Sequence, residues 1–321
     1  MNVAKEALQR YLLAALQREG LLTHAAFIGG TALRLLHELP RYSEDLDFIW
    51  TNKNAESQLA EWTKYLPKAI RALGALPEID AKNKSKDDAK VQKRGHSIVI
   101  SATAPAFTAF APHGIQIRFD IDLDPPAQTQ PESKTMRLLG GQIEIPSLTL
   151  PSLMAGKLHI LLTRPDREKG RDWFDYTWYR QKKILPNIPM LESAIQQTAN
   201  GPDAHYWTSY LRQRAKTVQW INVRSDVKPF LENPADSDSL NEVKIDHATP
   251  YPDFAEIEAE FFKQKDQHPL FLTKNPVMLD IHQAALEGDV AAIDLERAIV
   301  ALRPQMPPPP PKAQGPSMDD F

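Results

Sequence analysis

The sequence predicts an α/β fold of the α+β type, with a mixed-sheet domain over residues 1–150 and a helical domain over residues 151–303. Strand-like alternation of apolar and polar residues is confined to the first half, most clearly over residues 115–123, whereas helical periodicity dominates beyond residue 151. A length of 321 residues also favours two domains of ordinary size. Residues 304–321 include five consecutive prolines and are predicted to form a disordered tail.

The first domain is predicted to begin with an amphipathic helix over residues 3–19, because apolar side chains recur there at helical spacing and Gly20 follows. Next come a short apolar run, a glycine pair, a helix and a second strand-like run, which predict the order strand, tight turn, helix, strand. The remaining expectations are a helix at 56–73, an exposed Lys- and Asp-rich loop at 80–94, and strands at 97–103, 115–123 and 142–145.

The second domain is predicted from the helical spacing of its apolar and aromatic residues. An acidic stretch interrupted by prolines, residues 226–251, is expected to be irregular. Helices are expected at 152–163, 171–180, 190–199, 206–223, 254–265 and 276–302.

The amino-acid composition limits the location, the metals and the partners that we expect for this protein. Hydrophobic residues make up 42% and charged residues 25% of the chain, and no apolar run reaches the roughly 18 residues that a membrane span needs. The N-terminus lacks the pattern of a signal peptide, so we expect a cytoplasmic protein without a membrane partner. Because the chain has no cysteine, a metal would need oxygen or imidazole ligands, which favours Mg²⁺ or Mn²⁺. A net charge of −3 gives no general reason to expect nucleic-acid binding.

The glycine pair and a pair of aspartates carry the strongest chemical signal. Gly29 and Gly30 precede a predicted helix, where the backbone can approach a triphosphate and the helix N-terminal amides can face it, and the Thr31 hydroxyl could contribute. Asp45 and Asp47 are separated by one residue, so both project from the same face of a strand. Paired carboxylates of this kind can share divalent ions that stabilise phosphoryl transfer.

A third carboxylate for the same metal site is expected on the strand at 115–123. Asp120 is the favoured candidate and Asp122 is the next choice. Asp124 precedes two prolines, so it is expected to end the strand and face solvent. A strand, Gly-Gly-Thr, a helix, an Asp-x-Asp strand and a later acidic strand, in this order, are typical of the nucleotidyltransferase β fold.

The segment FIGGTALRLLHELPRYSEDLDF, residues 27–48, resembles the first motif of the AbiEii/AbiGii-type nucleotidyltransferases, a family of abortive-infection and toxin–antitoxin systems. A second block resembles the family's helical signature, in which a lysine, here Lys157, precedes an Arg-Asp-x-x-Asp pattern at residues 171–175. The resemblance covers about residues 25–50 and 115–180. The chain departs from the family pattern in its proline-rich tail and in Gly156.

The resemblance implies specific roles. Gly30 and Thr31 would hold phosphate, Asp45 and Asp47 would bind metal, Lys157 would contact the nucleotide, and Asp175 would complete the site. A lysine also suits a β- or γ-phosphate on chemical grounds. The pattern leaves two alternatives open: Arg171 and Asp175 have the i, i+4 spacing of an ordinary helix ion pair, and Asp172 fits a carboxylate that stabilises a helix start.

The favoured function is therefore transfer of a nucleoside monophosphate from an NTP to RNA, such as the acceptor end of tRNA, which would block translation. A basic cluster near the predicted site supports RNA, because phosphate contacts dominate affinity for nucleic acids. A protein or small-molecule acceptor is the first alternative and a non-catalytic NTP-binding regulator the second. A cognate antitoxin protein is a possible partner. The cluster consists of Arg164, Arg167, Lys169, Arg171, Arg180, Lys182 and Lys183.

Overall fold

The computed structural model describes residues 1–50, 55–88, 91–104, 111–138, 140–164, 168–198, 201, 203–250 and 276–301. The protein has the predicted α/β fold, with a mixed sheet followed by helices. The chain divides into two compact units, one with residues 1–207 and 214–248 and the other with residues 208–213 and 249–321. The first unit contains the whole sheet and the helices that directly follow it. The predicted helix at 254–265 and the predicted tail at 304–321 lie outside the described residues.

Within the described residues, seven strands form one mixed sheet in the order β3-β4-β5-β2-β1-β7-β6. Two neighbouring pairs, β2–β5 and β1–β7, are parallel, and the other pairs are antiparallel. The parallel pair β2–β5 lies at the centre of the sheet. The strands are β1 (Ala25–Ile28), β2 (Asp45–Trp50), β3 (Leu76–Asp88), β4 (Val91–Thr103), β5 (Ile115–Asp122), β6 (Pro131–Leu138) and β7 (Gly141–Leu148).

The predicted loop at 80–94 is wrong, because most of it belongs to the long antiparallel hairpin of β3 and β4. Its Lys- and Asp-rich sequence has no apolar alternation, but antiparallel strands pair through backbone hydrogen bonds, which do not depend on the type of side chain. Strand β6 was not predicted either, since its side chains are mostly polar and only Met136 is fully buried.

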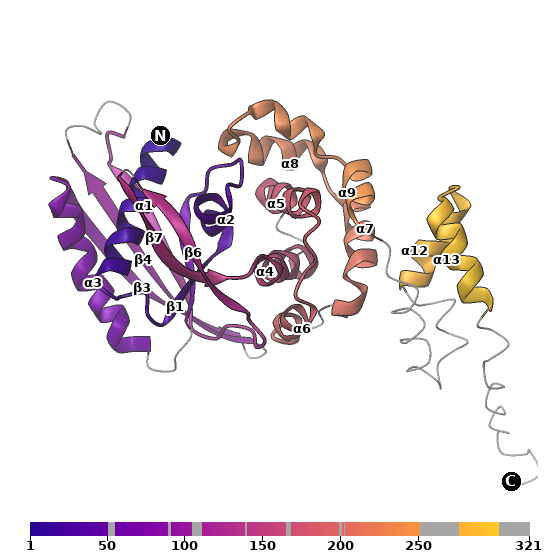
Figure 1. Cartoon of the computed structure of the whole chain (residues 1–321), viewed down its shortest axis with the longest axis horizontal. Helices are drawn as coiled ribbons and strands as arrows, with labels where there is room; N and C mark the ends of the chain where they lie inside the picture. Colours follow the sequence, from indigo (N-terminus) through magenta and orange to yellow (C-terminus); the bar gives the residue numbers. More distant parts are fainter. Residues whose placement is uncertain are drawn as a thin grey trace, which may run out of the picture. The chain divides into compact units, whose positions relative to one another are not determined.

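One face of the sheet is apolar and is covered by α1 (Asn2–Arg18) and α3 (Ala55–Ala72), on the left of the sheet in Figure 1. Phe48 from β2 and Phe119 from β5 stack on this face with ring centroids 6.4 Å apart, and the edge of Trp62 from α3 packs against both rings. These side chains are almost completely buried. Because side chains alternate along a strand, the polar residues of β2 and β5 must lie on the opposite face.

Helices occupy the opposite side of the sheet (Figure 1). They are α2 (Gly29–His37), α4 (Leu150–Thr163), α5 (Gly170–Gln181) and α6 (Ile188–Gln196), followed along the chain by α7 (Trp207–Thr217), α8 (Trp220–Val227) and the short α9 (Glu242–Ala248). The predicted helix at 206–223 is two helices, because the chain becomes extended at Val218. Asn187 caps the N-terminus of α6 by accepting a hydrogen bond from the Met190 amide.

The second unit contains the last two described helices, α12 (Pro276–Leu286) and α13 (Val290–Ala301). They replace the single helix predicted for 276–302. The break falls at Gly288, whose φ of 90° is incompatible with a continuing right-handed helix. In the described part of the chain, no helix is both long and apolar enough to cross a membrane.

Candidate active site

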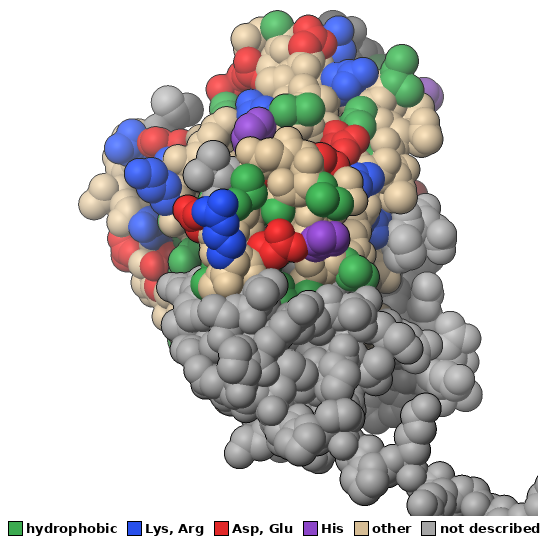
Figure 2. All heavy atoms as spheres, turned by 90° about the vertical axis from the view of Figure 1, so that its right-hand side faces the viewer, with side chains coloured by type: hydrophobic (Ala, Val, Ile, Leu, Met, Phe, Trp, Pro, Cys, Tyr) green, Lys and Arg blue, Asp and Glu red, His purple; other side chains and the backbone are tan. Residues whose placement is uncertain are grey.

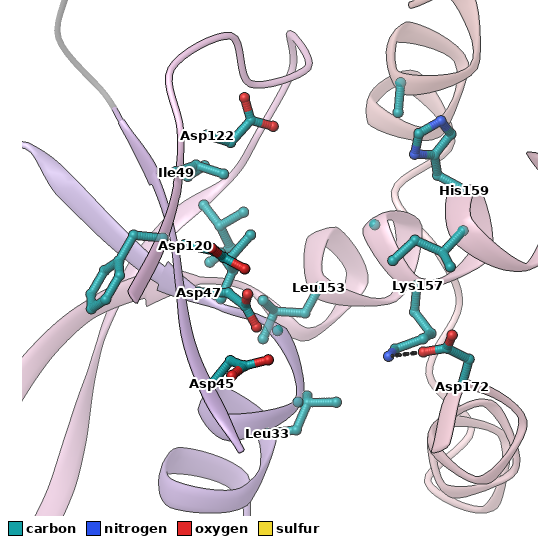
Figure 3. A pocket seen from close by; sticks show the side chains of 18 of the residues that line it. Leu33, Asp45, Asp47, Ile49, Asp120, Asp122, Leu153, Lys157, His159 and Asp172 are labelled. Atoms are coloured by element: carbon teal, nitrogen blue, oxygen red, sulfur yellow. Dashed lines mark hydrogen bonds and ion pairs between the residues drawn. The ribbon is translucent and has the colours of Figure 1, made fainter. Parts of the chain in front are cut away.

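The predicted metal ligands lie together on the sheet face opposite the aromatic core. Asp45 and Asp47 are on β2, and Asp47 is the Cα partner of Asp120 on the parallel strand β5. Partners in a parallel pair present their side chains on the same face, so three carboxylates stand side by side (Figure 3). All three are partly buried and line one cavity.

The strand register distinguishes the three candidates for the third carboxylate. Asp120 is level with Asp47, whereas Asp122 lies two residues further along, level with Ile49, and also lines the cavity. The Asp122 carboxylate accepts a hydrogen bond from the Asp124 amide at 2.9 Å, and β5 ends at Asp122. Asp124 thus follows the strand and does not line the cavity. This arrangement favours Asp120, and the metal role of each aspartate stays a prediction.

The two glycines make room for two neighbouring side chains. Gly29 has a φ of +78°, and a Cβ at this position would collide with the Asp47 carboxylate. A Cβ at Gly30 would lie 2.5 Å from Nη2 of Arg41 and 3.0 Å from Oγ of Ser43. Both glycines line the cavity at the start of α2. Their predicted role toward phosphate is compatible with this position, but the structure adds a second reason for their presence.

Thr31 lies differently from the expectation of a phosphate-binding hydroxyl. Its side chain is fully buried, and Oγ1 donates a hydrogen bond to the backbone carbonyl of Asp45. Thr31 therefore fixes the start of β2 relative to α2. Its hydroxyl is already used in this contact, so any contact with a phosphate would come from the backbone amide.

Across the cavity, Lys157 on α4 projects toward α5. Its Nζ lies 2.6 Å from Oδ1 of Asp172 and 2.8 Å from Oδ2 of Asp175. Lys157 and Asp172 line the cavity, whereas Asp175 is completely buried behind them and does not. Burial lowers the pKa of Lys157, but the two carboxylates more than offset this effect, so the net pKa is raised and the side chain is an ammonium ion.

Arg41 is a site residue that sequence reasoning assigned no role. Its side chain is 2% exposed, and Nε and Nη2 donate to Oδ1 and Oδ2 of Asp175, each at 2.6 Å. Burial raises the pKa of Asp175, but Arg41 and Lys157 reverse the effect, so its pKa is lowered and it stays ionised. The arginine lies within the segment that resembles the family motif, but only the fold brings it to Asp175.

The i, i+4 ion pair considered for Arg171 and Asp175 does not form. Arg171 instead pairs with Glu44 at 2.9 Å, and its guanidinium lies over the Phe230 ring, 4.3 Å from the centroid. Asp175 is occupied by Arg41 and Lys157. The segment between α2 and β2 is therefore bound to α5 by two ion pairs, Arg41–Asp175 and Glu44–Arg171.

These residues surround a cavity of about 820 Å³ between the sheet and helices α4–α6. Figure 3 shows Asp45, Asp47 and Asp120 on the sheet side and Lys157, His159 and Asp172 on the helical side. Several cations also line the cavity: Arg118 from β5, Arg171 from α5, and Arg164 and Lys169, which directly follow α4 and precede α5. Arg167 lies outside the described residues. The volume is within the range of about 300–1,000 Å³ typical of small-molecule sites.

The surroundings of Asp45 disfavour the ionised form of its carboxyl group. Burial raises the pKa of Asp45, Arg118 lowers it, and the charges of Asp120 and Glu44 raise it further, so the net pKa is above its ordinary value. Within the described residues, no three His, Asp or Glu side chains are already gathered as a metal site. The donors are nevertheless of the hard oxygen type that Mg²⁺ and Mn²⁺ prefer, and a bound cation would relieve their mutual repulsion.

Comparison with known proteins identifies the family of the chain. Residues 10–312 match the family model described as nucleotidyl transferase AbiEii toxin, type IV TA system. No curated protein matches the chain. Similar solved structures include a protein described as a candidate nucleotidyltransferase from H. pylori, with 16% identity and a TM-score of 0.44, covering 82% of this chain and 96% of that one. Another is JHP933 from Helicobacter pylori, with 17% identity and a TM-score of 0.42, covering 84% and 96%. The family match spans nearly the whole chain, and the protein therefore belongs to the AbiEii nucleotidyl transferase toxin family of type IV toxin–antitoxin systems.

Proposed function

We propose that this nucleotidyltransferase moves a nucleoside monophosphate from an NTP to RNA, such as the acceptor end of tRNA, in a reaction that depends on Mg²⁺ or Mn²⁺. Membership of the family implies nucleotidyl transfer from an NTP and an antitoxin partner. The observation that carries the finer proposal is the placement of Asp45, Asp47 and Asp120 across one cavity from Lys157. Modification of the acceptor end would block translation.

The three aspartates are the proposed metal ligands. Asp47 and Asp120 are paired across β2 and β5, and Asp45 stands on the same face, so side-chain rotation can direct the carboxylates toward a shared ion. When bound, the divalent ion would neutralise charge on the phosphates and favour ionisation of the attacking hydroxyl. The contribution of the protein is to hold the carboxylates in a partly buried cavity, where electrostatic interactions are stronger than in water.

The NTP would lie between the glycine pair and Lys157. Gly29 and Gly30 line the cavity at the start of α2, so a phosphate bound there would face the amides of the helix N-terminus. Lys157 has three N–H donors, of which two are directed at Asp172 and Asp175. A third donor directed into the cavity would contact a β- or γ-phosphate and orient the leaving pyrophosphate.

An RNA acceptor is supported by the cations of the cavity. Arg164 and Lys169 line its helical side and Arg118 lines its sheet side, so a phosphodiester backbone could be held from both. On the face drawn in Figure 2, by contrast, basic and acidic side chains are interspersed and form no basic stripe. The proposed RNA contacts are therefore placed at the cavity rim rather than on this face. Both substrates are abundant in the cytoplasm, where we propose that the enzyme acts.

The acceptor can be identified directly. The purified protein would be incubated with each of the four NTPs, labelled at the α-phosphate, together with total RNA and, separately, with total protein. We expect ribonuclease-sensitive label in RNA, with one or two of the NTPs preferred, and no label after chelation of divalent ions. Label in protein alone would contradict the RNA proposal, and undiminished transfer in the presence of chelator would contradict the metal proposal.

A further inference from the structure

A buried chain of charges connects the segment before β2 to the wall of the cavity. Arg41 binds both oxygens of Asp175 at 2.6 Å, Asp175 binds Lys157 at 2.8 Å, and Lys157 binds Asp172 at 2.6 Å. The chain runs from the fully buried Asp175 to Lys157 and Asp172, which line the cavity. Arg41 also lines the cavity, and its connection to the proposed nucleotide contact Lys157 runs through Asp175.

Arg41 is itself held from several directions. Nη1 donates to the Tyr42 carbonyl at 2.9 Å, and Nη2 fits against Gly30, where no other residue would leave space. The backbone around Arg41 is paired with a distant segment, since the Tyr42 amide donates to the Phe230 carbonyl at 2.7 Å and Arg41 forms a β-bridge with Leu231. These contacts hold the guanidinium in the position from which it binds both oxygens of Asp175.

A planar guanidinium that binds a carboxylate through two parallel hydrogen bonds fixes its rotation as well as its position. The Oδ2 atom that faces Lys157 is the same atom that accepts from Nη2 of Arg41. A change in the tilt of Asp175 would therefore move the anchor of Lys157, whose ammonium group lies at the cavity surface. A simple buried ion pair would have no such consequence for the cavity.

We propose that Arg41 is a positioning residue for nucleotidyl transfer, which acts by fixing Asp175 so that Lys157 is aimed at the phosphates of the NTP. The inference rests on the proposed nucleotide contact of Lys157. It assigns Arg41 a function that depends on Lys157, and this dependence separates it from a purely structural role.

The test is a double-mutant cycle between Arg41→Lys and Lys157→Ala, read as kcat and KM for the NTP and as NTP affinity at equilibrium. Lysine keeps the positive charge but loses the two parallel hydrogen bonds. We expect Arg41→Lys to lower kcat/KM at least about 10-fold in the wild-type background but less than about twofold when Lys157 is already alanine. If the Lys157→Ala variant turns over too slowly to measure, the same cycle is read in NTP affinity alone.

Arg34→Lys is the matched control. Arg34 also holds two carboxylates, with Nε 2.7 Å from Glu6 and Nη1 2.6 Å from Glu232, but it does not line the cavity. We expect its substitution to lower the melting temperature by a few degrees without changing kcat/KM. A similar loss of activity in the Arg34 and Arg41 variants would overturn the proposal, because general destabilisation would then explain both.

The remaining outcomes are also decisive. Losses that multiply in the double variant would show that Arg41 acts independently of Lys157 and would overturn the inference. Normal kinetics in Lys157→Ala would instead contradict the proposed nucleotide contact itself. If Arg41→Lys does not fold, Asp175→Asn replaces it in the cycle, because asparagine keeps the shape of the anchor and removes its charge. Failure of both variants to fold would overturn the inference by showing that the pair is required for folding.

Discussion

Asp47 and Asp120 are partners across the parallel strands β2 and β5, although 72 residues separate them in the chain. The register of this pair places both carboxylates on the polar face of the sheet, level with each other. A shift of one residue in either strand would turn one carboxylate into the aromatic core formed by Phe48 and Phe119. The hydrophobic pattern that fixes the register thus also fixes the proposed metal site.

Replacing Asp47 with asparagine should lower transfer at least about 100-fold, because the shape is kept and the charge that would hold a divalent ion is lost. Asp120→Asn should have a similar effect. Asp124→Asn is the control, since Asp124 follows the strand and does not line the cavity. Activity would be measured at saturating NTP over a range of Mg²⁺ concentrations. A stronger effect at Asp124 than at Asp120 would contradict the proposed ligand set.

Gly29→Ala should abolish transfer and lower the free energy of unfolding by more than about 2 kcal/mol, because the new Cβ combines a positive φ with a collision against Asp47. Gly74→Ala separates these two effects. Gly74 has a φ of +72° and open space around the Cβ position, so its substitution tests backbone strain alone.

We expect Gly74→Ala to lower the free energy of unfolding by about 1 kcal/mol and to leave transfer unchanged. Urea unfolding and NTP turnover of both variants would be compared. Equal stability losses at the two positions would show that contact with Asp47 is not the reason for glycine at position 29.

Stability should decline in acid through His37. Burial, together with the charges of Lys134 and Lys182, lowers the pKa of this imidazole from 6.5 to about 4, while Glu132 lies 3.9 Å from Nε2. Between pH 6.5 and about 4 the unfolded chain therefore binds a proton that the folded protein does not. The stabilising contribution is complete above pH 6.5 and is lost as the pH falls through this window.

The measurement is the melting temperature between pH 7.5 and 4 for the wild type, for His37→Gln and for His205→Gln. His205 is exposed, so its substitution controls for loss of any histidine. We expect a shallower decline only in His37→Gln. Parallel curves for all three proteins would assign the acid sensitivity to other groups.

Neutralising Arg164 and Lys169 together should weaken RNA binding and flatten its dependence on salt, because each lost phosphate contact reduces the number of counterions released. NTP affinity should change little. Lys228 is exposed, Lys244 is partly exposed, and neither lines the cavity, so their double glutamine variant is the matched control. RNA affinity would be measured at several salt concentrations. Equal slopes for the two double variants would argue against RNA docking at this rim.

The central part of the fold was predictable because its local patterns agree with its tertiary environment. Alternation along β5 is genuine, since Ile117, Phe119 and Ile121 are buried and Asp120 is on the other face. The β3–β4 hairpin was not predictable in this way, because its outer part is charged and depends on backbone pairing. The breaks in the predicted helices 206–223 and 276–302 were not evident from the sequence, because apolar spacing continues across Val218 and Gly288, where the backbone turns.

The candidate site was predictable where its residues are close in sequence. Asp45 and Asp47 show their shared face by their spacing alone, and the glycine pair marks a turn. The partners of Asp175 were not evident, because Arg41 is 134 residues away and the helical spacing suggested Arg171 instead. A buried arginine gives no local pattern. Only its position within a family-like segment singled out the neighbourhood of Arg41.

The pairing of residues 40–42 with residues 230–232 has a consequence for synthesis of the toxin. The Tyr42 amide and the Pro40 carbonyl find their partners in Phe230 and Glu232, which a ribosome adds long after the sheet is complete. A nascent chain that ends before this point lacks the backbone hydrogen bonds that hold the residues on either side of Arg41. Translation therefore delivers the finished cleft late, when most of the chain has already emerged, and a prematurely terminated product lacks this support for its active site.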